Sequence, residues 1–181
     1  IRKGFAAIKA EADAKIAELE VQGIQGSSAD QYNFYRGVSI VCEGMITFAK
    51  RYAEACALKA AETADPARKA ELLRIADTMG WIMDKPARNF RDAIQCHWFY
   101  QMCVMMDSNL HGASLGRIDK YLGSYAEADL ASGAMTREEI QELVDLYYLK
   151  TASLNKTWSA MAVRSGPGYT SGQLFTLGGI D

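Results

Sequence analysis

The sequence predicts an α/β protein in which helices predominate and strands are short and few. Apolar residues recur at helical spacing through most of positions 2–106. Proline and helix-capping residues separate these periodic stretches. Nine of the fifteen glycines follow residue 111, and in this half short strands are expected near 109–116 and 173–178.

The overall composition is that of a globular protein. Of its 181 residues, 49% are apolar and 23% charged, which excludes a disordered tail or a disulfide miniprotein. The net charge of -2 favours neither nucleic acid nor an anionic membrane as a partner. No apolar run approaches the ~20 residues needed to cross a bilayer. The start Ile1-Arg2-Lys3-Gly4 resembles no signal peptide, which predicts a chain beginning inside a longer cytoplasmic protein.

The cysteines and histidines indicate neither disulfides nor a metal. Cys42, Cys56, Cys96 and Cys103 lie in helix-patterned segments, and none forms a C-x-x-C pair. We therefore expect buried free thiols in a reducing cytosol. The two histidines do not cluster with the cysteines, so the sequence predicts no metal site.

Two helices are expected at the start of the chain. Residues 2–22 are amphipathic, and Gly23–Ser28 follows as a loop. Asp30 is expected to cap a second helix that runs to about Thr63, because its carboxylate can accept hydrogen bonds from first-turn amides. The apolar middle of this helix predicts a deeply packed rod with a stripe of Tyr35, Val38, Val41, Met45, Phe48, Tyr52 and Cys56.

Two further helices are expected before residue 107. Asp65-Pro66 indicates the start of the third, with a buried stripe of Leu72, Leu73, Ile75 and Met79. After Pro86, Asn89 and Asp92 are expected to cap a fourth helix through about Met106. Residues 94–106 are apolar on nearly every face, which predicts burial on several sides.

The second half alternates loops with helices. Residues 109–116 are expected as a loop or short strand, followed by a helix over 117–130 that Gly133 ends. Thr136-Arg-Glu-Glu139 is a capping box for a helix to about Leu154. A glycine-rich loop over 165–172 then leads into a short strand.

Few side chains suggest chemistry by themselves. His111 lies in a glycine-flanked loop, where an imidazole could serve a polar pocket or satisfy local backbone groups. His97 lies in an apolar helix and is interpreted as structural. Arg117 and Asp119 form either an anion contact or a structural pair between loop and helix. Gly166–Gly172 lacks the lysine and following helix of a phosphate-binding loop and is interpreted as a turn.

A resemblance to a known family rests on ordered motifs. The run Pro86-Ala-Arg-Asn-Phe-Arg-Asp-Ala-Ile-Gln-Cys-His-Trp-Phe99 resembles the P-x-x-x-F-x-E-A-x-Q-x-x-W-F stretch of the glycyl radical enzymes, the pyruvate formate-lyase-like superfamily, with Asp92 in place of Glu. The run Asn109-Leu-His-Gly-Ala-Ser-Leu-Gly-Arg-Ile-Asp-Lys-Tyr121 resembles their N-x-x-x-x-S-x-G-R-x-D-x-Y segment. The resemblance covers about residues 31–181 and continues through Asp129-Leu130, Thr136-Arg-Glu-Glu139 and Thr176-Leu-Gly-Gly179.

The resemblance implies that residues 1–181 are an internal part of one pyruvate formate-lyase-like domain in a much longer chain. That domain would be a ten-stranded α/β barrel wrapped in helices, active as a homodimer in anaerobic cytoplasm. A separate radical S-adenosylmethionine activase would install a glycyl radical near the C-terminus. The glycyl radical would generate a thiyl radical on a barrel cysteine, which abstracts hydrogen from a small organic substrate.

Neither radical-bearing residue is expected in this segment. The family's radical loop reads R-V-x-G-Y, whereas Val163-Arg-Ser-Gly-Pro-Gly168-Tyr169 has transposed residues and an inserted proline. The thiyl cysteine of members lies in a loop such as G-C-V-E, whereas Cys42-Glu43 lies within an expected helix. The segment alone is therefore expected to be inactive and to bind no cofactor directly.

The resemblance identifies His111 and Gly112 as substrate-binding candidates and assigns no catalytic residue here. In members that act on vicinal diols, the loop reads N-G-H-S-x-S-x-G-R, and its His-Ser pair touches substrate hydroxyls. His111 matches this pattern, but Gly112 stands at the serine position. The missing hydroxyl disfavours diol dehydration and favours a larger or less hydroxylated substrate.

These observations favour a segment of a glycyl radical lyase or decarboxylase. A non-catalytic helical scaffold or interaction module is the alternative, and it would fold alone as a compact unit. A third interpretation is an acid-base enzyme that uses His111. The substrate, the bond cleaved and the subclass stay open at this point.

Overall fold

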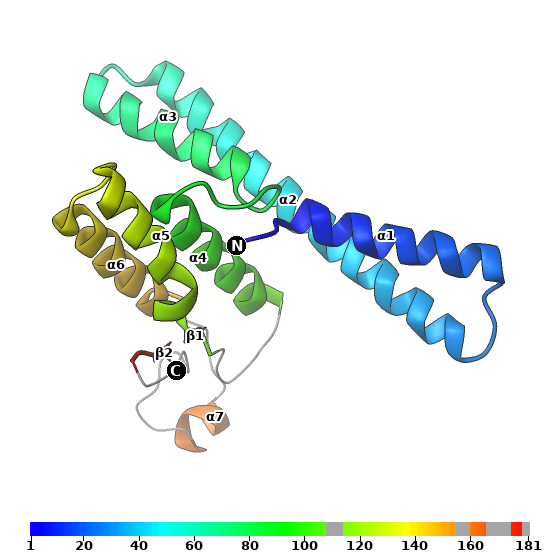
Figure 1. The fold of residues 1–181 in the computed structure, drawn as a ribbon. Helices are drawn as coiled ribbons and strands as arrows, with labels where there is room; N and C mark the ends of the chain where they lie inside the picture. Colours follow the sequence, from blue (N-terminus) through cyan, green and yellow to red (C-terminus); the bar gives the residue numbers. More distant parts are fainter. Residues whose placement is uncertain (108–113, 155–159, 166–174, 179–181) are drawn as a thin grey trace. The chain divides into compact units, whose positions relative to one another are not determined.

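A computed structural model describes residues 1–107, 114–154, 160–165 and 175–178 of the chain (Figure 1). The chain divides into two compact units, residues 1–88 and 89–181. Within the described part of the chain, no helix is both long and apolar enough to cross a membrane.

The first unit consists of three helices, α1 (Phe5–Gln22), α2 (Ser27–Glu62) and α3 (Pro66–Trp81). Helix α1 packs against the first part of α2, and α3 packs against its second part (Figure 1). Apolar burial on α1 is confined to one side, at Ala12, Ile16 and Leu19, as the amphipathic pattern predicts.

A polar link joins α1 to α2. The Ser39 hydroxyl, on a nearly buried side chain, donates to Asp13 Oδ1 at 2.6 Å. Lys9 Nζ lies 2.8 Å from Asp13 Oδ2 and 3.5 Å from Glu43 Oε2. The Lys9 ammonium, followed by the Ser39 hydroxyl, holds the pKa of Asp13 below its usual value. These bonds fix how α1 is aligned along α2.

The expectation that Asp30 caps α2 is wrong. The helix begins at Ser27, and Gly26 occupies the N-cap position without a side-chain cap. The Ser28 hydroxyl accepts from the Gln25 amide at 2.8 Å and donates to the Gln25 carbonyl at 2.9 Å. This local turn starts the helix early and leaves Asp30 in its first turn.

The expected buried stripe of α2 is also displaced. Val41 and Tyr52 are 54% and 46% exposed, whereas the side chains that pack inward are Ser39, Cys42, Ile46, Ala49 and Ala60. Small residues predominate in this set, because close approach between helices selects for short side chains rather than for the largest apolar ones. The predicted deeply packed rod is, in this structure, a helix buried along one stripe.

Helix α3 begins as predicted but buries a narrower stripe. Asp65 Oδ1 accepts from the Ala67 amide at 3.0 Å, and Pro66 occupies the first turn. Leu72 is buried together with Met79, whereas Leu73 and Ile75 are exposed. The buried stripe is narrower because α3 packs mainly against one helix, α2, so a single row of its side chains is covered.

The start of α1 is capped by backbone. The Phe5 amide donates to the Met83 carbonyl at 2.6 Å, and the Ala6 amide donates to the Asp84 carbonyl at 3.3 Å. Gly4 makes this approach possible, because it has φ of +79° and a Cβ there would lie 2.5 Å from the Asp84 carbonyl oxygen. The first amides of α1 therefore need no side-chain cap.

The second unit contains helices α4 (Phe90–Asp107), α5 (Ile118–Ser132), α6 (Arg137–Ala152) and α7 (Ala160–Ser165). Strands β1 (Gly116–Arg117) and β2 (Phe175–Thr176) pair in parallel, with Gly116 opposite Phe175. The strand expected near 173–178 is confirmed as β2, whereas β1 meets the range expected near 109–116 only at Gly116, and residues 109–113 lie outside the described part of the chain. Helix α7 is an element that the sequence patterns did not predict.

The predicted caps of this unit are present. Asn89 Oδ1 accepts from the Asp92 amide at 2.9 Å, which caps α4. Gly133 ends α5 with a left-handed φ of 70°. At the start of α6, Thr136 and Glu139 form both bonds of the capping box.

Helix α4 is the most buried helix segment of the unit and packs against α5 and α6. Buried side chains occupy several of its faces, as the sequence predicts: Phe90, Asp92, Ala93, Ile94, Cys96, Phe99, Gln101 and Met105. Among the described side chains of this helix, Arg91, Tyr100 and Met106 are exposed.

Candidate functional site

The site is built from the residues that flank the expected substrate loop. His111 and Gly112, the two predicted substrate-binding residues, lie outside the described residues, as does Gly166–Gly172. The description resumes at Ser114, three positions after His111. The segment from Ser114 to Arg117 therefore defines where the chain leaves this loop and enters β1.

The entry into β1 has a defined backbone geometry. Gly116 has a φ of +67°, a conformation that side-chain-bearing residues rarely adopt. Its amide donates to Ser114 Oγ at 3.4 Å. The Leu115 side chain, between them, is only 3% exposed. A buried side chain and a glycine-specific turn together fix the direction of the chain here.

An ion pair joins β1 to the start of α5. Arg117 donates from Nε to Asp119 Oδ1 at 2.9 Å and from a terminal nitrogen to Oδ2 at 2.8 Å. The Asp119 carboxylate also accepts from the Gly178 amide at 3.1 Å. The guanidinium is the main reason that the pKa of Asp119 lies well below its usual range. The pair expected from the sequence is present, and it also ties α5 to the chain after β2.

A hydrogen-bonded row connects three helices to the same segment. His97 Nδ1 on α4 lies 2.7 Å from the Tyr147 hydroxyl on α6. His97 Nε2 lies 2.8 Å from the Tyr121 hydroxyl on α5. The Tyr121 hydroxyl donates in turn to the Leu115 carbonyl. The imidazole and the Tyr121 ring also stack, with centroids 5.0 Å apart and planes 30° apart.

Every member of this row is neutral near pH 7, and burial widens the pH range over which this holds. Burial lowers the pKa of His97 to about 4 and raises the pKa of Tyr121 to about 12. The pKa of Tyr147 is raised as well, chiefly by burial. The row therefore holds one imidazole proton and two hydroxyl protons under ordinary conditions.

Neutrality and the final acceptor assign each proton. Because the Tyr121 hydroxyl donates to a carbonyl, its oxygen accepts from His97 Nε2–H. His97 Nδ1 is then unprotonated and accepts from the Tyr147 hydroxyl. The row thus runs in one direction, from Tyr147 through His97 and Tyr121 to the backbone of Leu115.

Aromatic contacts fix β2 to α6 in the same region. The Phe175 ring lies with its centroid 4.6 Å from that of Tyr148 and 6.0 Å from that of Tyr147. The second contact is edge to face, with an angle of 79° between the planes. Tyr147 therefore participates both in the hydrogen-bonded row and in the packing of β2.

Sequence patterns identified His97 only as a structural residue and did not predict its partners. Tyr121 and Tyr147 lie 24 and 50 positions away along the chain. A polar imidazole inside an otherwise apolar helix was the one available signal, because such a group needs hydrogen-bond partners when buried. The identity of those partners depends on helix packing.

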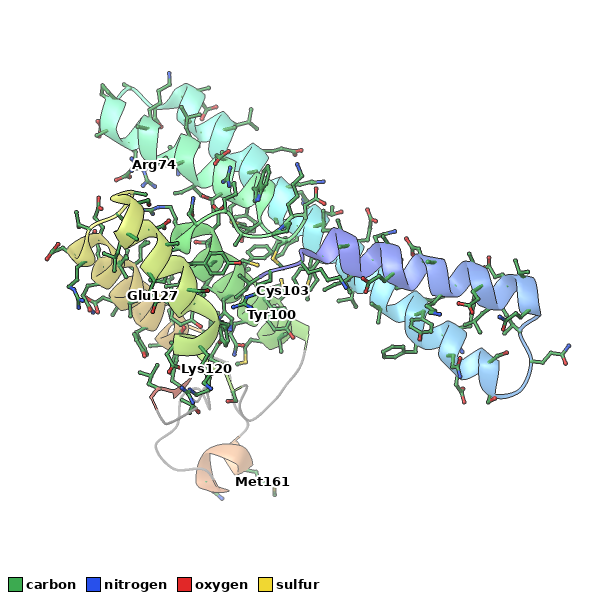
Figure 2. All side chains as sticks on the ribbon, in the orientation of Figure 1. Arg74, Tyr100, Cys103, Lys120, Glu127 and Met161 are labelled. Carbon is green, nitrogen blue, oxygen red and sulfur yellow. The ribbon has the colours of Figure 1, made fainter. Side chains whose placement is uncertain are left out.

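The cysteines occupy helices rather than loops. All four are free thiols, with Cys42 and Cys56 on α2 and Cys96 and Cys103 on α4. Burial raises the thiol pKa of Cys42, Cys96 and Cys103. Cys103 and Tyr100 both project from α4, three residues apart (Figure 2). Among the residues that the structure describes, no three metal-binding side chains form a cluster.

The sequence of this chain is similar to those of known proteins. The sequence model of the family described as pyruvate formate lyase-like matches residues 1–181. The chain is 33% identical over 181 residues to the isethionate sulfite-lyase of Nitratidesulfovibrio vulgaris, covering 99% of this chain and 22% of that protein. It is 36% identical over 138 residues to the indoleacetate decarboxylase of Tractidigestivibacter scatoligenes, covering 74% of this chain and 16% of that protein.

Solved structures show the same relationship. The glycerol-bound B12-independent glycerol dehydratase from Clostridium butyricum superimposes with a TM-score of 0.90 at 31% identity. The match covers 98% of this chain and 22% of the dehydratase. The chain thus spans about a fifth of the length of the relatives it matches. The motif resemblance, the family match over all 181 residues and the shared fold together show that this chain belongs to the pyruvate formate lyase-like family of glycyl radical enzymes.

Proposed function

We propose that this chain is an internal segment of a glycyl radical lyase or decarboxylase that acts on a small organic substrate by thiyl-radical hydrogen abstraction. The observation that carries the proposal is the family match over residues 1–181. It is supported by relatives that are, by name, a sulfite-lyase, a decarboxylase and a dehydratase.

Both compact units belong, in this proposal, to one domain whose complete form is a ten-stranded barrel surrounded by helices. The parallel pairing of β1 with β2 is the arrangement expected of two barrel strands. Large apolar side chains on α2, such as Phe34, Ile40 and Leu58, are 62–69% exposed. This exposure fits a helix that further protein covers, and it argues against a self-contained scaffold module.

The radical-bearing glycine and cysteine lie outside this segment in the proposal. The four cysteines fit a thiyl role poorly, because all of them lie within helices rather than in a loop. A thiyl radical supplies the power to abstract hydrogen from an unactivated carbon. The contribution of this segment is to hold the substrate and exclude water, and the segment alone is expected to be inactive.

His111 and Gly112 are proposed to contact the substrate. A glycine at position 112 provides no hydroxyl for a polyol, whereas a histidine at position 111 can donate to a sulfonate, a carboxylate or a single hydroxyl. We therefore favour a substrate of the isethionate or arylacetate type over glycerol. The hydrogen-bonded row ending at Leu115 would hold the C-terminal side of this loop.

The proposal further includes a homodimer in anaerobic cytoplasm. It requires a separate radical S-adenosylmethionine activase as a partner. Neither nucleic acid nor a membrane is included, because a net charge of -2 supplies no attraction to either surface.

The test is anaerobic activation of the full-length protein that contains these residues. Purified protein is incubated with its activase, reductant and S-adenosylmethionine, and electron paramagnetic resonance is recorded. We expect a glycyl radical signal that is absent when S-adenosylmethionine is omitted. Turnover is then measured separately with isethionate, indoleacetate and glycerol, with glycerol expected to be the poorest substrate.

A known glycyl radical enzyme activated in parallel serves as the positive control. No radical signal in the test protein, under conditions that activate this control, would overturn the assignment. A radical signal combined with fastest turnover of glycerol would retain the enzyme class but contradict the substrate proposal based on Gly112.

A further inference from the structure

We propose that His97 is a positioning residue that, through the Tyr121 hydroxyl, fixes the Leu115 carbonyl and thereby the start of the described segment that follows His111 and Gly112. No part of this inference requires His97 to touch substrate. Its functional consequence rests on the proposed function, because it assumes that the loop contacts the substrate.

The hydrogen bonds of the row all run in the same donor-to-acceptor direction. Each bond in the row has a donor and an acceptor, and the row ends on a backbone carbonyl rather than on another side chain. The donor-to-acceptor direction of these bonds cannot be reversed, because the Leu115 carbonyl oxygen can only accept a hydrogen bond. The position of that carbonyl therefore depends on where His97 holds the Tyr121 hydroxyl.

Packing alone would not require these groups. An imidazole and two phenols buried between helices lose hydration, and an apolar side chain of similar size would fill the space without that loss. Hydrogen bonds among these polar atoms, and to the backbone, offset the lost hydration. The bond to Leu115 is where the row acts on the backbone of the segment that enters β1.

Leu115 is held in place through both its side chain and its backbone carbonyl. Its buried side chain anchors one side of the residue, and the Tyr121 hydroxyl anchors the carbonyl on the other. Two residues later, Arg117 is held by Asp119. The chain is thus held at both positions, and Leu115 lies four positions after His111 in the sequence.

The decisive test compares two amide substitutions at the same position in the full-length protein. His97→Gln places an amide near the former Nε2 position and can still donate to the Tyr121 hydroxyl. His97→Asn places its amide near the former Nδ1 position and can reach only the Tyr147 hydroxyl. The two variants are similar in polarity but retain opposite ends of the row.

Two further tyrosine variants complete the set. Tyr121→Phe removes the donor to Leu115 without changing the ring. Tyr32→Phe is the matched control, because the Tyr32 hydroxyl donates to Glu20 on the first unit, at 3.2 Å, and belongs to no part of the row. All proteins are first compared by thermal unfolding so that misfolded variants are recognised.

The first readout is amide hydrogen exchange of a peptide spanning residues 114–117, which needs no radical. We expect exchange to be about threefold to tenfold faster in His97→Asn and Tyr121→Phe, the change that loss of one net hydrogen bond produces. Wild-type exchange is expected in His97→Gln and Tyr32→Phe. Equal exchange in the Gln and Asn variants would overturn the proposal.

The second readout is steady-state kinetics with isethionate or indoleacetate, whichever the activated wild type turns over. His97→Asn should raise KM by a similar factor while kcat and the glycyl radical signal stay near wild type, and His97→Gln should restore KM. A parallel fall in kcat and in radical yield would indicate a general structural role and overturn the proposal. If the wild type forms no radical, the proposed function fails, whereas the exchange experiment still decides the role of His97.

Discussion

Asp129, near the C-terminal end of α5, caps the first turn of α4. Its Oδ2 accepts a hydrogen bond from the Phe90 amide at 2.9 Å, across 39 positions of sequence. The Asp129 side chain is only 8% exposed. Meanwhile its backbone carbonyl accepts from the Ala134 amide at 2.9 Å, where α5 ends. One residue therefore satisfies the beginning of one helix and the end of another.

Replacing Asp129 by alanine should destabilise the second unit by about 1–3 kcal/mol, because the buried Phe90 amide would lose its acceptor. Asp129→Asn keeps an acceptor oxygen and should cost less. Asp30→Ala is the matched control, since Asp30 lies in the first turn of α2 but does not cap it. Thermal unfolding and limited proteolysis of the full-length protein measure the difference. Equal losses for Asp129→Ala and Asp30→Ala would contradict the capping role.

Gly4→Ala should weaken the start of α1 by more than about 2 kcal/mol, because it combines a left-handed φ with overlap against the Asp84 carbonyl. Gly133→Ala shares the left-handed φ but has open space around its Cβ, so about 1 kcal/mol is expected. Gly37→Ala lies in the middle of α2 in open space and should stabilise by about 0.5–1 kcal/mol. Native-state hydrogen exchange of the amides of each affected helix reports these local free energies.

The order of those three variants is the informative result. If Gly4→Ala and Gly133→Ala were equally destabilising, the close approach of the Asp84–Lys85 backbone to Gly4 would carry no energetic weight.

Features encoded over three or four neighbouring residues could be predicted from the sequence. Asp65 with Pro66, Asn89, Gly133 and the Thr136–Glu139 box all act on amides or carbonyls within their own turn. Such signals depend on local backbone chemistry and not on the rest of the fold. They located most helix ends to within a few residues.

Features that depend on a distant partner could not be predicted in this way. The inward stripe of α2 is set by α1 and α3, so Ser39 and Ala49 are buried while Val41 is exposed. The partners of His97 are decided by how α5 and α6 pack on α4. For the site, motif resemblance indicated the family, and the described residues show the support around Leu115 rather than His111 and Gly112 themselves.

Asp119→Asn should loosen the chain after β2. The substitution removes the charge that attracts Arg117 and weakens the bond from the Gly178 amide, which is 3.1 Å long. We expect the Gly178 amide to exchange about tenfold faster in the full-length protein, as loss of a charge-assisted hydrogen bond predicts. Asp145→Asn on the exposed face of α6, where the partner is Gln141, should leave that amide unchanged. Unchanged exchange in Asp119→Asn would mean that the pairing of β1 with β2 alone protects Gly178.

Lowering the pH should destabilise the folded chain, because His97 is buried in its neutral form. Its pKa is lowered from 6.5 to about 4 in the folded chain, so between these values the unfolded state binds a proton that the folded state does not. Stability therefore falls as pH is lowered from 6.5 towards 4 and this contribution levels off below the folded pKa. The full window corresponds to about 3 kcal/mol as an upper estimate. Thermal unfolding of the wild type and of His97→Gln, recorded from pH 7.5 to 4.5, isolates this contribution. We expect the variant to lose less stability than the wild type across that range, because glutamine does not titrate, whereas superimposable pH profiles would show that the imidazole is not held neutral by the fold.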